Sequence, residues 1–245
     1  MAQTVHFHGH AGYVGRVGES GSPWSQVVWF AGVALLAFLA PFLFASVLEL
    51  QHDFYYLIYF AVTLSALAAY VRLNAIDVGE VLRQNWKLSV GVGALSTAFV
   101  VWSVLAKVDS TPHPTGWYFA FEIVWRGVFY GLVDALLLSA FPGLVAWQIM
   151  KRKIDGLRRR VSFGALTMVL VIALTAVYHL GYEDLRNSEG IRNPEIGNTV
   201  ISLPVVVSAN PLGSVIAHTS MHITAVTHSY ESGDRLPPQT FVDSD

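Results

Sequence analysis

The sequence contains no cysteine among its 245 residues. This absence excludes disulfide bonds, thiolate nucleophiles and zinc or iron–sulfur sites with cysteine ligands. Charged residues are also scarce: they make up 13% of the chain, whereas a soluble domain carries roughly a quarter. No basic patch lies outside the loops that flank apolar segments, and the net charge is −2, so nothing indicates nucleic-acid binding. We expect a membrane protein, because there is too little polar surface to cover a water-soluble globule.

Apolar segments recur along most of the chain, and hydrophobic residues make up 53% of it. Since a membrane-spanning helix needs about 20 mainly apolar residues, the sequence predicts an all-α, polytopic bundle of about six transmembrane helices. The predicted segments are 26–48, 54–73, 88–106, 117–149, 161–180 and 211–228. The last segment is placed after Pro211, because Pro204 and the Asn210–Pro211 pair favour a turn.

One membrane domain, residues 26–228, is therefore expected between two polar tails, 1–25 and 229–245. The first tail is too polar and too weakly basic for a signal peptide, so we expect the first helix to stay as an anchor. The alternating His6, His8 and His10 in this tail are able to bind a transition metal loosely, but we expect a solvated tail rather than a metal site.

Lysine and arginine gather in two of the predicted loops, 74–87 and 150–160, and the other loops are acidic or poor in basic residues. Because short cytoplasmic loops carry an excess of lysine and arginine, these two loops are predicted to be cytoplasmic. With six crossings, the pattern predicts a multi-pass protein of the cell membrane with both termini in the cytoplasm.

Ionisable residues inside the predicted helices carry the functional information, since each costs about 2.5–3.5 kcal/mol to insert and needs a partner or a role. Glu122 and Arg126 lie four residues apart on one helix face and can form an ion pair. Gly127 and Gly131 permit close approach of a neighbouring helix. Asp134 adds a third charge on nearly the same face. The ion pair can be purely structural or part of a site.

Histidines supply the other candidates. His218 and His222 lie four residues apart, a spacing that stacks two imidazoles on one helix face as metal-binding helices require. His179 ends the preceding predicted helix. At roughly 1.5 Å rise per residue, Glu122, His179 and His218 fall in the same half of the bilayer if all three helices are measured from the outer side. The sequence thus permits one shared site in the outer half of the membrane.

These pieces, in this order and on separate helices, resemble the CAAX protease and bacteriocin-processing (CPBP) family of intramembrane metalloprotease-like proteins. The family pattern is EExxxR, then FxxxH, then HxxxN. Glu122 and Arg126 match the end of the first motif, His179 the second and His218 the third. The resemblance covers about half of the chain, and it implies catalytic roles for Glu122, Arg126, His179 and His218.

The sequence also departs from that family. Phe121 stands where the family has its water-activating glutamate, Thr175 replaces the aromatic residue of the second motif, and His222 replaces the asparagine of the third. A hydrolase of this kind needs a carboxylate that takes a proton from water, and phenylalanine cannot do so. The change to His222, by contrast, adds a metal ligand.

Three functions stay open. The first is a metal-dependent intramembrane endopeptidase that acts on a peptide or membrane-protein substrate, with His179, His218 and His222 as ligands of a divalent ion, zinc before other transition metals. The second is a divergent, non-catalytic relative that acts through partners in the bilayer. The third is a haem or proton-relay protein in which His179 faces His218 or His222.

Overall fold

A computed structural model describes residues 22–186 and 188–231, and within these ranges the chain is helical without a strand. The predicted all-α fold is therefore confirmed. Five helical runs are long and apolar enough to cross a membrane: 23–47, 52–73, 86–107, 116–149 and 156–180. They match the first five predicted segments to within a few residues. The His6, His8 and His10 cluster lies outside the described residues.

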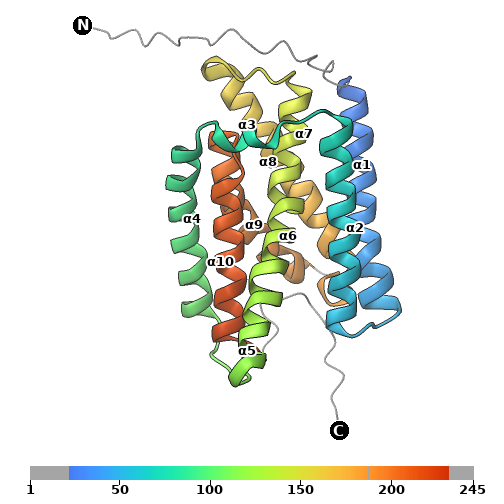
Figure 1. Cartoon of the computed structure of the whole chain (residues 1–245), viewed down its shortest axis with the longest axis vertical. Helices are drawn as coiled ribbons and strands as arrows, with labels where there is room; N and C mark the ends of the chain where they lie inside the picture. Colours follow the sequence, from blue (N-terminus) through green and yellow to red (C-terminus); the bar gives the residue numbers. More distant parts are fainter. Residues whose placement is uncertain (1–21, 187, 232–245) are drawn as a thin grey trace, which may run out of the picture.

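The elements follow one another in an up-and-down order (Figure 1). They are α1 (Pro23–Ala40) with the π-helical η1 (Pro41–Val47), α2 (His52–Leu73), the short α3 (Val78–Arg83), α4 (Trp86–Lys107), α5 (Gly116–Glu122), η2 (Ile123–Tyr130), α6 (Gly131–Ala135), η3 (Leu136–Ala140), α7 (Phe141–Ile149), α8 (Gly156–Leu180), the 3-10 turn η4 (Glu183–Leu185), α9 (Ser188–Ser208) and α10 (Leu212–His228). The elements from α5 to α7 form one continuous run.

The described residues contain one long helix, α9, in addition to the six predicted segments. Helix α9 runs the length of α4 in the opposite direction: Asn193 shares a cavity with Lys107 at one end, and Asn85 donates to the Ser208 carbonyl at the other. Helix α10 then returns, because the amide of Gly213 bonds to Ser89 near the start of α4. With α9 and α10 added to the five apolar runs, seven long helical runs lie side by side within residues 22–186 and 188–231.

The extra pass exists because Pro204 does not end a helix. It lies inside α9, where the N–H of the next residue, Val205, donates to the Ser214 hydroxyl of α10 at 3.3 Å. Proline is tolerated in membrane helices when neighbouring serine groups satisfy the backbone in this way. The predicted turn at Asn210–Pro211 is present, but it joins α9 to α10 at the end of the bundle where α3 lies.

One consequence concerns the two ends of the described chain. The start of α1 lies beside the end of α2, since Gln26 bonds to Asn74 at 2.7 Å, and Arg152 donates to the Asn74 carbonyl at 2.8 Å. Both basic loops therefore lie at the end of the bundle where α1 begins. His228 instead contacts the Val108 carbonyl at the opposite end. The first and last residues that the structure describes therefore lie at opposite ends of the bundle.

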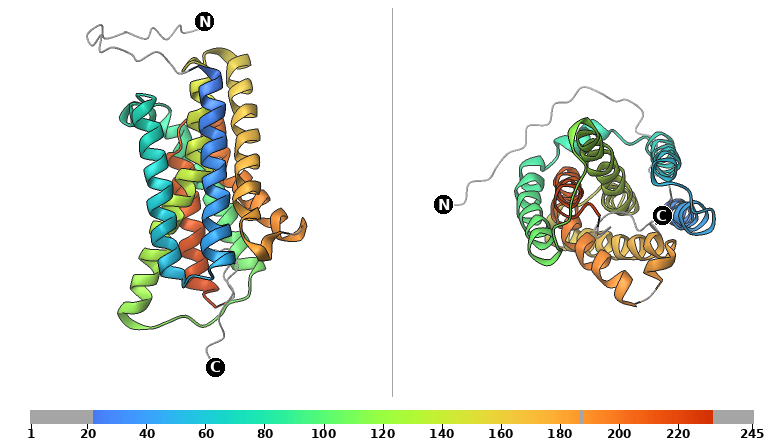
Figure 2. Two further views of the ribbon diagram at one scale, coloured as in Figure 1. Left: turned by 90° about the vertical axis from the view of Figure 1, so that its right-hand side faces the viewer. Right: turned by 90° about the horizontal axis from the view of Figure 1, so that it is seen from below.

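The run from α5 to α7 is the central helix of the bundle. Within its most apolar 18 residues 72% are buried, against 22–33% in the other four long apolar runs. Those outer helices expose leucine and valine, such as Leu35, Leu95 and Val169, as expected of surfaces that face lipid. Figure 2 shows the bundle from the side and from one end. Any site on the central helix is thus enclosed by protein.

Candidate metal centre

Asp134 occupies an unusual stretch of the central helix. It lies in α6, a five-residue α-helical segment between the π-helical segments η2 and η3. A π-helical turn inside an α-helix shifts the faces that follow it, and such turns are frequent at functional sites. Asp134 is 4% exposed. The irregular helix thus presents a carboxylate to the interior of the bundle.

A glycine brings the histidine helix close to this carboxylate. A side-chain Cβ at Gly131 would lie 2.9 Å from the Cα of Thr219, closer than real Cβ contacts allow, and 3.2 Å from the His222 ring, which is tighter than most. Only glycine permits this approach of η2 and α6 to α10. Gly127 packs against Ile223 in the same way, one turn further along. The close-approach face predicted from Gly127 and Gly131 is therefore present, and α10 is the neighbour.

Asp134, His218 and His222 form the centre of the candidate site. Nε2 of His218 lies 3.7 Å from Oδ2 of Asp134, and Nε2 of His222 lies 3.8 Å from the same oxygen. The two imidazoles stack with centroids 5.1 Å apart. All three side chains are buried, and one ligand atom from each falls within 4.8 Å of the others. These separations are too long for hydrogen bonds, but they suit groups that share a small cation.

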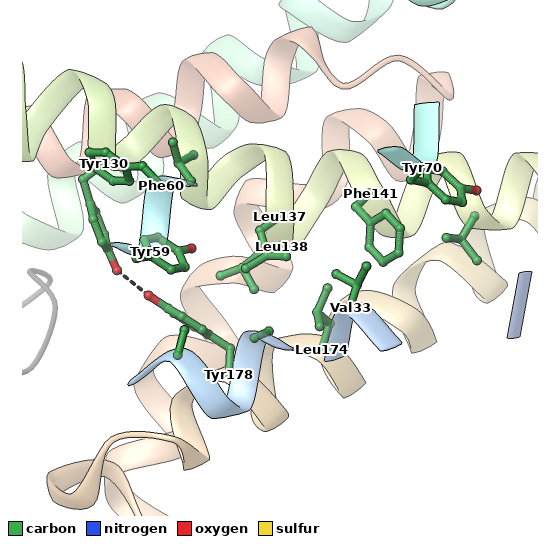
Figure 3. Close-up of a cluster of buried hydrophobic side chains, with 14 of the residues drawn as sticks. Val33, Tyr59, Phe60, Tyr70, Tyr130, Leu137, Leu138, Phe141, Leu174 and Tyr178 are labelled. Carbon is green, nitrogen blue, oxygen red and sulfur yellow. Dashed lines mark hydrogen bonds between the residues drawn. The ribbon is translucent and has the colours of Figure 1, made fainter. Parts of the chain in front are cut away.

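Tyrosines surround the carboxylate on its other side. The hydroxyl of Tyr59 on α2 donates a hydrogen bond to Oδ1 of Asp134, and the ring of Tyr130 meets His222 edge-on at 5.0 Å. The Tyr130 and Tyr178 hydroxyls are 2.6 Å apart (Figure 3). The row continues from Tyr178 to Tyr182 at 2.7 Å and on to Tyr55 at 2.5 Å. These buried hydroxyls hold the walls of the site together.

Glu122 and Arg126 form a separate pair. Nε of Arg126 lies 2.5 Å from Oε2 of Glu122, and both side chains are buried. Glu122 lies 134 − 122 = 12 residues before Asp134, which at about 1.5 Å rise per residue is roughly 18 Å along the helix. The pair belongs to the end of the bundle where α10 finishes. The structure does not bring it together with the two histidines of α10.

Tyr230, two residues after the end of α10, covers that ion pair. The guanidinium of Arg126 lies 5.3 Å from the ring centroid of Tyr230, a cation–π contact. Burial raises the pKa of Tyr230 above its ordinary value, so the phenol stays neutral over the cation. The segment is fixed by Thr111, whose amide donates to the His228 carbonyl and whose hydroxyl accepts from the Glu231 amide. This arrangement closes the end of the bundle over Arg126.

His179 lies outside the ligand group. Its Nδ1 is 2.8 Å from the Thr175 carbonyl one turn earlier, and its ring packs edge-on against Tyr178. Among the described residues, the set whose ligand atoms lie within 4.8 Å of one another contains Asp134 in place of His179. A role for His179 as a metal ligand therefore stays a prediction from the sequence. In the structure its Nδ1 bonds to a carbonyl of its own helix.

Asp134 is the functional candidate that sequence reasoning left out of the site. The sequence alone could have pointed to Asp134, because it is a carboxylate inside a predicted membrane segment and lies on the same helix face as Gly127 and Gly131. The expected common depth does not hold, because it assumed that α10 begins at the end of the bundle where Glu122 and His179 lie. That helix starts beside Ser89, at the end of the basic loops.

A comparison of the chain with protein-family models, curated proteins and solved structures found no match.

Proposed function

We propose that this chain is an integral membrane protein that holds a divalent metal ion at Asp134, His218 and His222. The observation that supports the proposal is the convergence of these three buried side chains, with ligand atoms within 4.8 Å of one another. Carboxylate oxygen and imidazole nitrogen are both ligands that divalent transition metals take in proteins.

The donor set fits such an ion. Zinc binds histidine nitrogen and carboxylate oxygen at about 2.0–2.2 Å, so two ligand atoms on one ion lie at most about 4 Å apart. The separations of 3.7 and 3.8 Å between Asp134 and the two histidines meet this limit. Two imidazoles and one carboxylate suit zinc and also other transition metals. Zinc remains the first candidate.

Peptide hydrolysis is the activity that the resemblance to CPBP proteins suggests for this centre. Asp134, His218 and His222 would hold the ion, and the ion would supply Lewis acidity and a bound water that is more acidic than free water. Tyr59 donates a hydrogen bond to Oδ1 of Asp134, so that Oδ2 faces the histidines. Burial of the centre keeps bulk water away from it.

A non-catalytic role is the second candidate, and the position of Glu122 favours it. A hydrolytic site needs a carboxylate beside the water that it activates. Glu122 is paired with Arg126 roughly 18 Å along the helix from Asp134. In this case the ion cross-links α6 and α10, and the protein acts through partners in the bilayer. The second function needs the same three ligands and no base.

A haem is favoured less than a small cation. Bis-histidine haem ligation needs two imidazoles on opposite faces of the porphyrin. Here the rings of His218 and His222 stack on one helix, and the carboxylate of Asp134 lies within 4 Å of both Nε2 atoms.

The basic loops suggest an orientation for the protein in the cell membrane. Excess lysine and arginine mark cytoplasmic loops, so the end of the bundle with α3 and the loop after α7 is proposed to face the cytoplasm. The chain then enters α1 from the cytoplasm and leaves α10 on the other side, because there are seven passes.

Elemental analysis of the purified protein in detergent or nanodiscs tests the metal site. We expect about one equivalent of a transition metal in the wild type and its loss in Asp134→Asn and His218→Asn. Glu122→Gln is the matched control, because it changes an equally buried carboxyl on the same helix outside the ligand group. Metal retained by Asp134→Asn, or absent from a folded wild type offered zinc, contradicts the proposal. Cleavage of a membrane peptide by metal-loaded protein then separates the two candidate roles.

A further inference from the structure

A cavity of about 230 Å³ lies between α4 and α9, away from the metal centre. It is lined by Phe99, Val100, Ser103, Lys107 and Val108 at the end of α4 and by Asn193, Ile196 and Gly197 of α9. Gly197 is buried and contributes no side chain, which leaves room between the two helices. The cavity lies near the end of the bundle opposite the basic loops.

The lining of this cavity is divided between two kinds of side chain. Lys107, Asn193 and Ser103 supply an ammonium, an amide and a hydroxyl, all of which can donate hydrogen bonds. Phe99 and Ile196 supply apolar surface, and they are 41% and 50% exposed on the outside of the bundle. The apolar part therefore opens toward lipid tails, whereas Lys107 closes the last turn of a membrane-spanning helix.

The setting of Lys107 places it at the level of lipid headgroups. Its Nζ lies 5.4 Å from the ring centroid of Trp102, and tryptophan and lysine near helix ends are typical of the membrane interface. Trp117, at the start of the next apolar run, is 79% exposed at the same end of the bundle. A cation held here meets the phosphate layer of the surrounding leaflet.

We propose that this cavity binds one phospholipid molecule. Its phosphate group accepts hydrogen bonds from Lys107 and Asn193, and one acyl chain lies along Phe99 and Ile196 between α4 and α9. A soluble anion would leave the apolar surface of Phe99 and Ile196 uncovered, and an uncharged lipid would leave the ammonium of Lys107 without an anion. The combination selects a molecule with an anionic head and a hydrocarbon tail. This site does not depend on the metal centre.

The test uses the full chain in nanodiscs of phosphatidylcholine with phosphatidylglycerol, and native mass spectrometry counts the lipids that stay bound after transfer to detergent. Wild type should retain one phospholipid. Lys107→Gln should weaken its binding about fivefold, the effect of one lysine near a membrane surface. Lys87→Gln is the matched control, since Lys87 makes the same contact with Trp86 at the other end of α4 without this cavity. Equal losses in both variants overturn the proposal.

Two competitors identify which part of the ligand is held. Inorganic phosphate and diacylglycerol should both fail to displace the bound phospholipid. Displacement by inorganic phosphate means that the site takes a soluble anion, and displacement by diacylglycerol means that it is a general apolar groove; either result contradicts the proposal. Gly197→Val fills the cavity while keeping Lys107, so it should lose the lipid. A folded Gly197→Val protein, checked by thermal unfolding, that keeps the lipid places that lipid elsewhere.

Discussion

Tyr59 of α2 donates a hydrogen bond to Oδ1 of Asp134, which leaves Oδ2 as the oxygen that faces both histidines of α10. A hydrogen bond to a metal-binding side chain from a residue that does not itself touch the metal fixes the orientation of that ligand. Loss of such a bond typically lowers metal affinity by about 10–100-fold. We therefore expect Tyr59→Phe to weaken metal binding by that factor while the ligands stay in place. Titration of the metal-free protein with Zn²⁺ against a competing chelator measures the change.

Tyr70→Phe is the control for this prediction. Tyr70 is another fully buried tyrosine of α2, and its hydroxyl donates to Gln26 at 2.7 Å, away from the metal centre. It should cost a similar amount of stability, about 0.5–1.5 kcal/mol for one hydrogen bond, with unchanged metal affinity. If both variants weaken binding equally, the effect is general loosening of the bundle, and Tyr59 has no special role.

The fold class followed from composition and apolar runs alone, because a span of about 20 apolar residues has few alternatives to a helix. Helix α9 did not follow, since its two prolines and its polar residues Asn193 and Asn198 break the apolar pattern. Its buried Asn198 is instead accommodated by another helix, since its amide donates to Thr175 at 2.6 Å. Such tertiary bonds are invisible in a single sequence.

The candidate site was predictable in part. His218 and His222 were found because two ligands on one helix have a fixed spacing. Their partner Asp134 is on another helix, and which helices meet depends on the direction of α10. That direction depends on α9, so without α9 the start of α10, and His218 with it, was assigned to the wrong end of the bundle. Long-range pairing was therefore the missing information.

The contact between α4 and α10 depends on a glycine. A Cβ at Gly213 would lie 2.0 Å from the Ser89 carbonyl oxygen and 2.8 Å from Cβ of Pro204. Gly213→Ala should therefore destabilise the protein by about 1–3 kcal/mol or more through overpacking, seen as a lower midpoint of thermal unfolding. Gly91→Ala, where nothing lies within 4 Å, should leave the midpoint unchanged or raise it. Equal effects of the two substitutions contradict this packing.

The absence of cysteine makes the number of passes easy to test, because single-cysteine variants need no prior changes. With seven passes, Ser22→Cys and Lys153→Cys should react with a membrane-impermeant maleimide from one side of the membrane. Asp109→Cys and Glu231→Cys should react from the other side. All four side chains are exposed. Labelling of Ser22→Cys and Glu231→Cys from the same side contradicts the path of α9 and restores six crossings.

The last prediction concerns the position that the CPBP resemblance singles out. By that resemblance, Phe121→Glu restores a water-activating carboxylate and raises peptidase activity. In the structure Phe121 is 41% exposed and stacks with Tyr118 and Trp125 on the outside of the central helix. A glutamate there faces the lipid side and is roughly 18–20 Å along the helix from Asp134. Phe121→Glu should therefore leave cleavage of a membrane peptide unchanged.

Glu122→Gln completes this comparison. It leaves Arg126 buried without its anion, which costs about 3–5 kcal/mol of stability, but it should not change metal content, because Glu122 is outside the ligand group. The double variant Glu122→Leu with Arg126→Met removes both charges and should recover most of that stability. Its cleavage activity is then decisive. If the wild type cleaves peptide and this stable double variant does not, the ion pair takes part in the reaction and the separation of the two sites is wrong. If both cleave equally, the chemistry belongs to the metal centre alone.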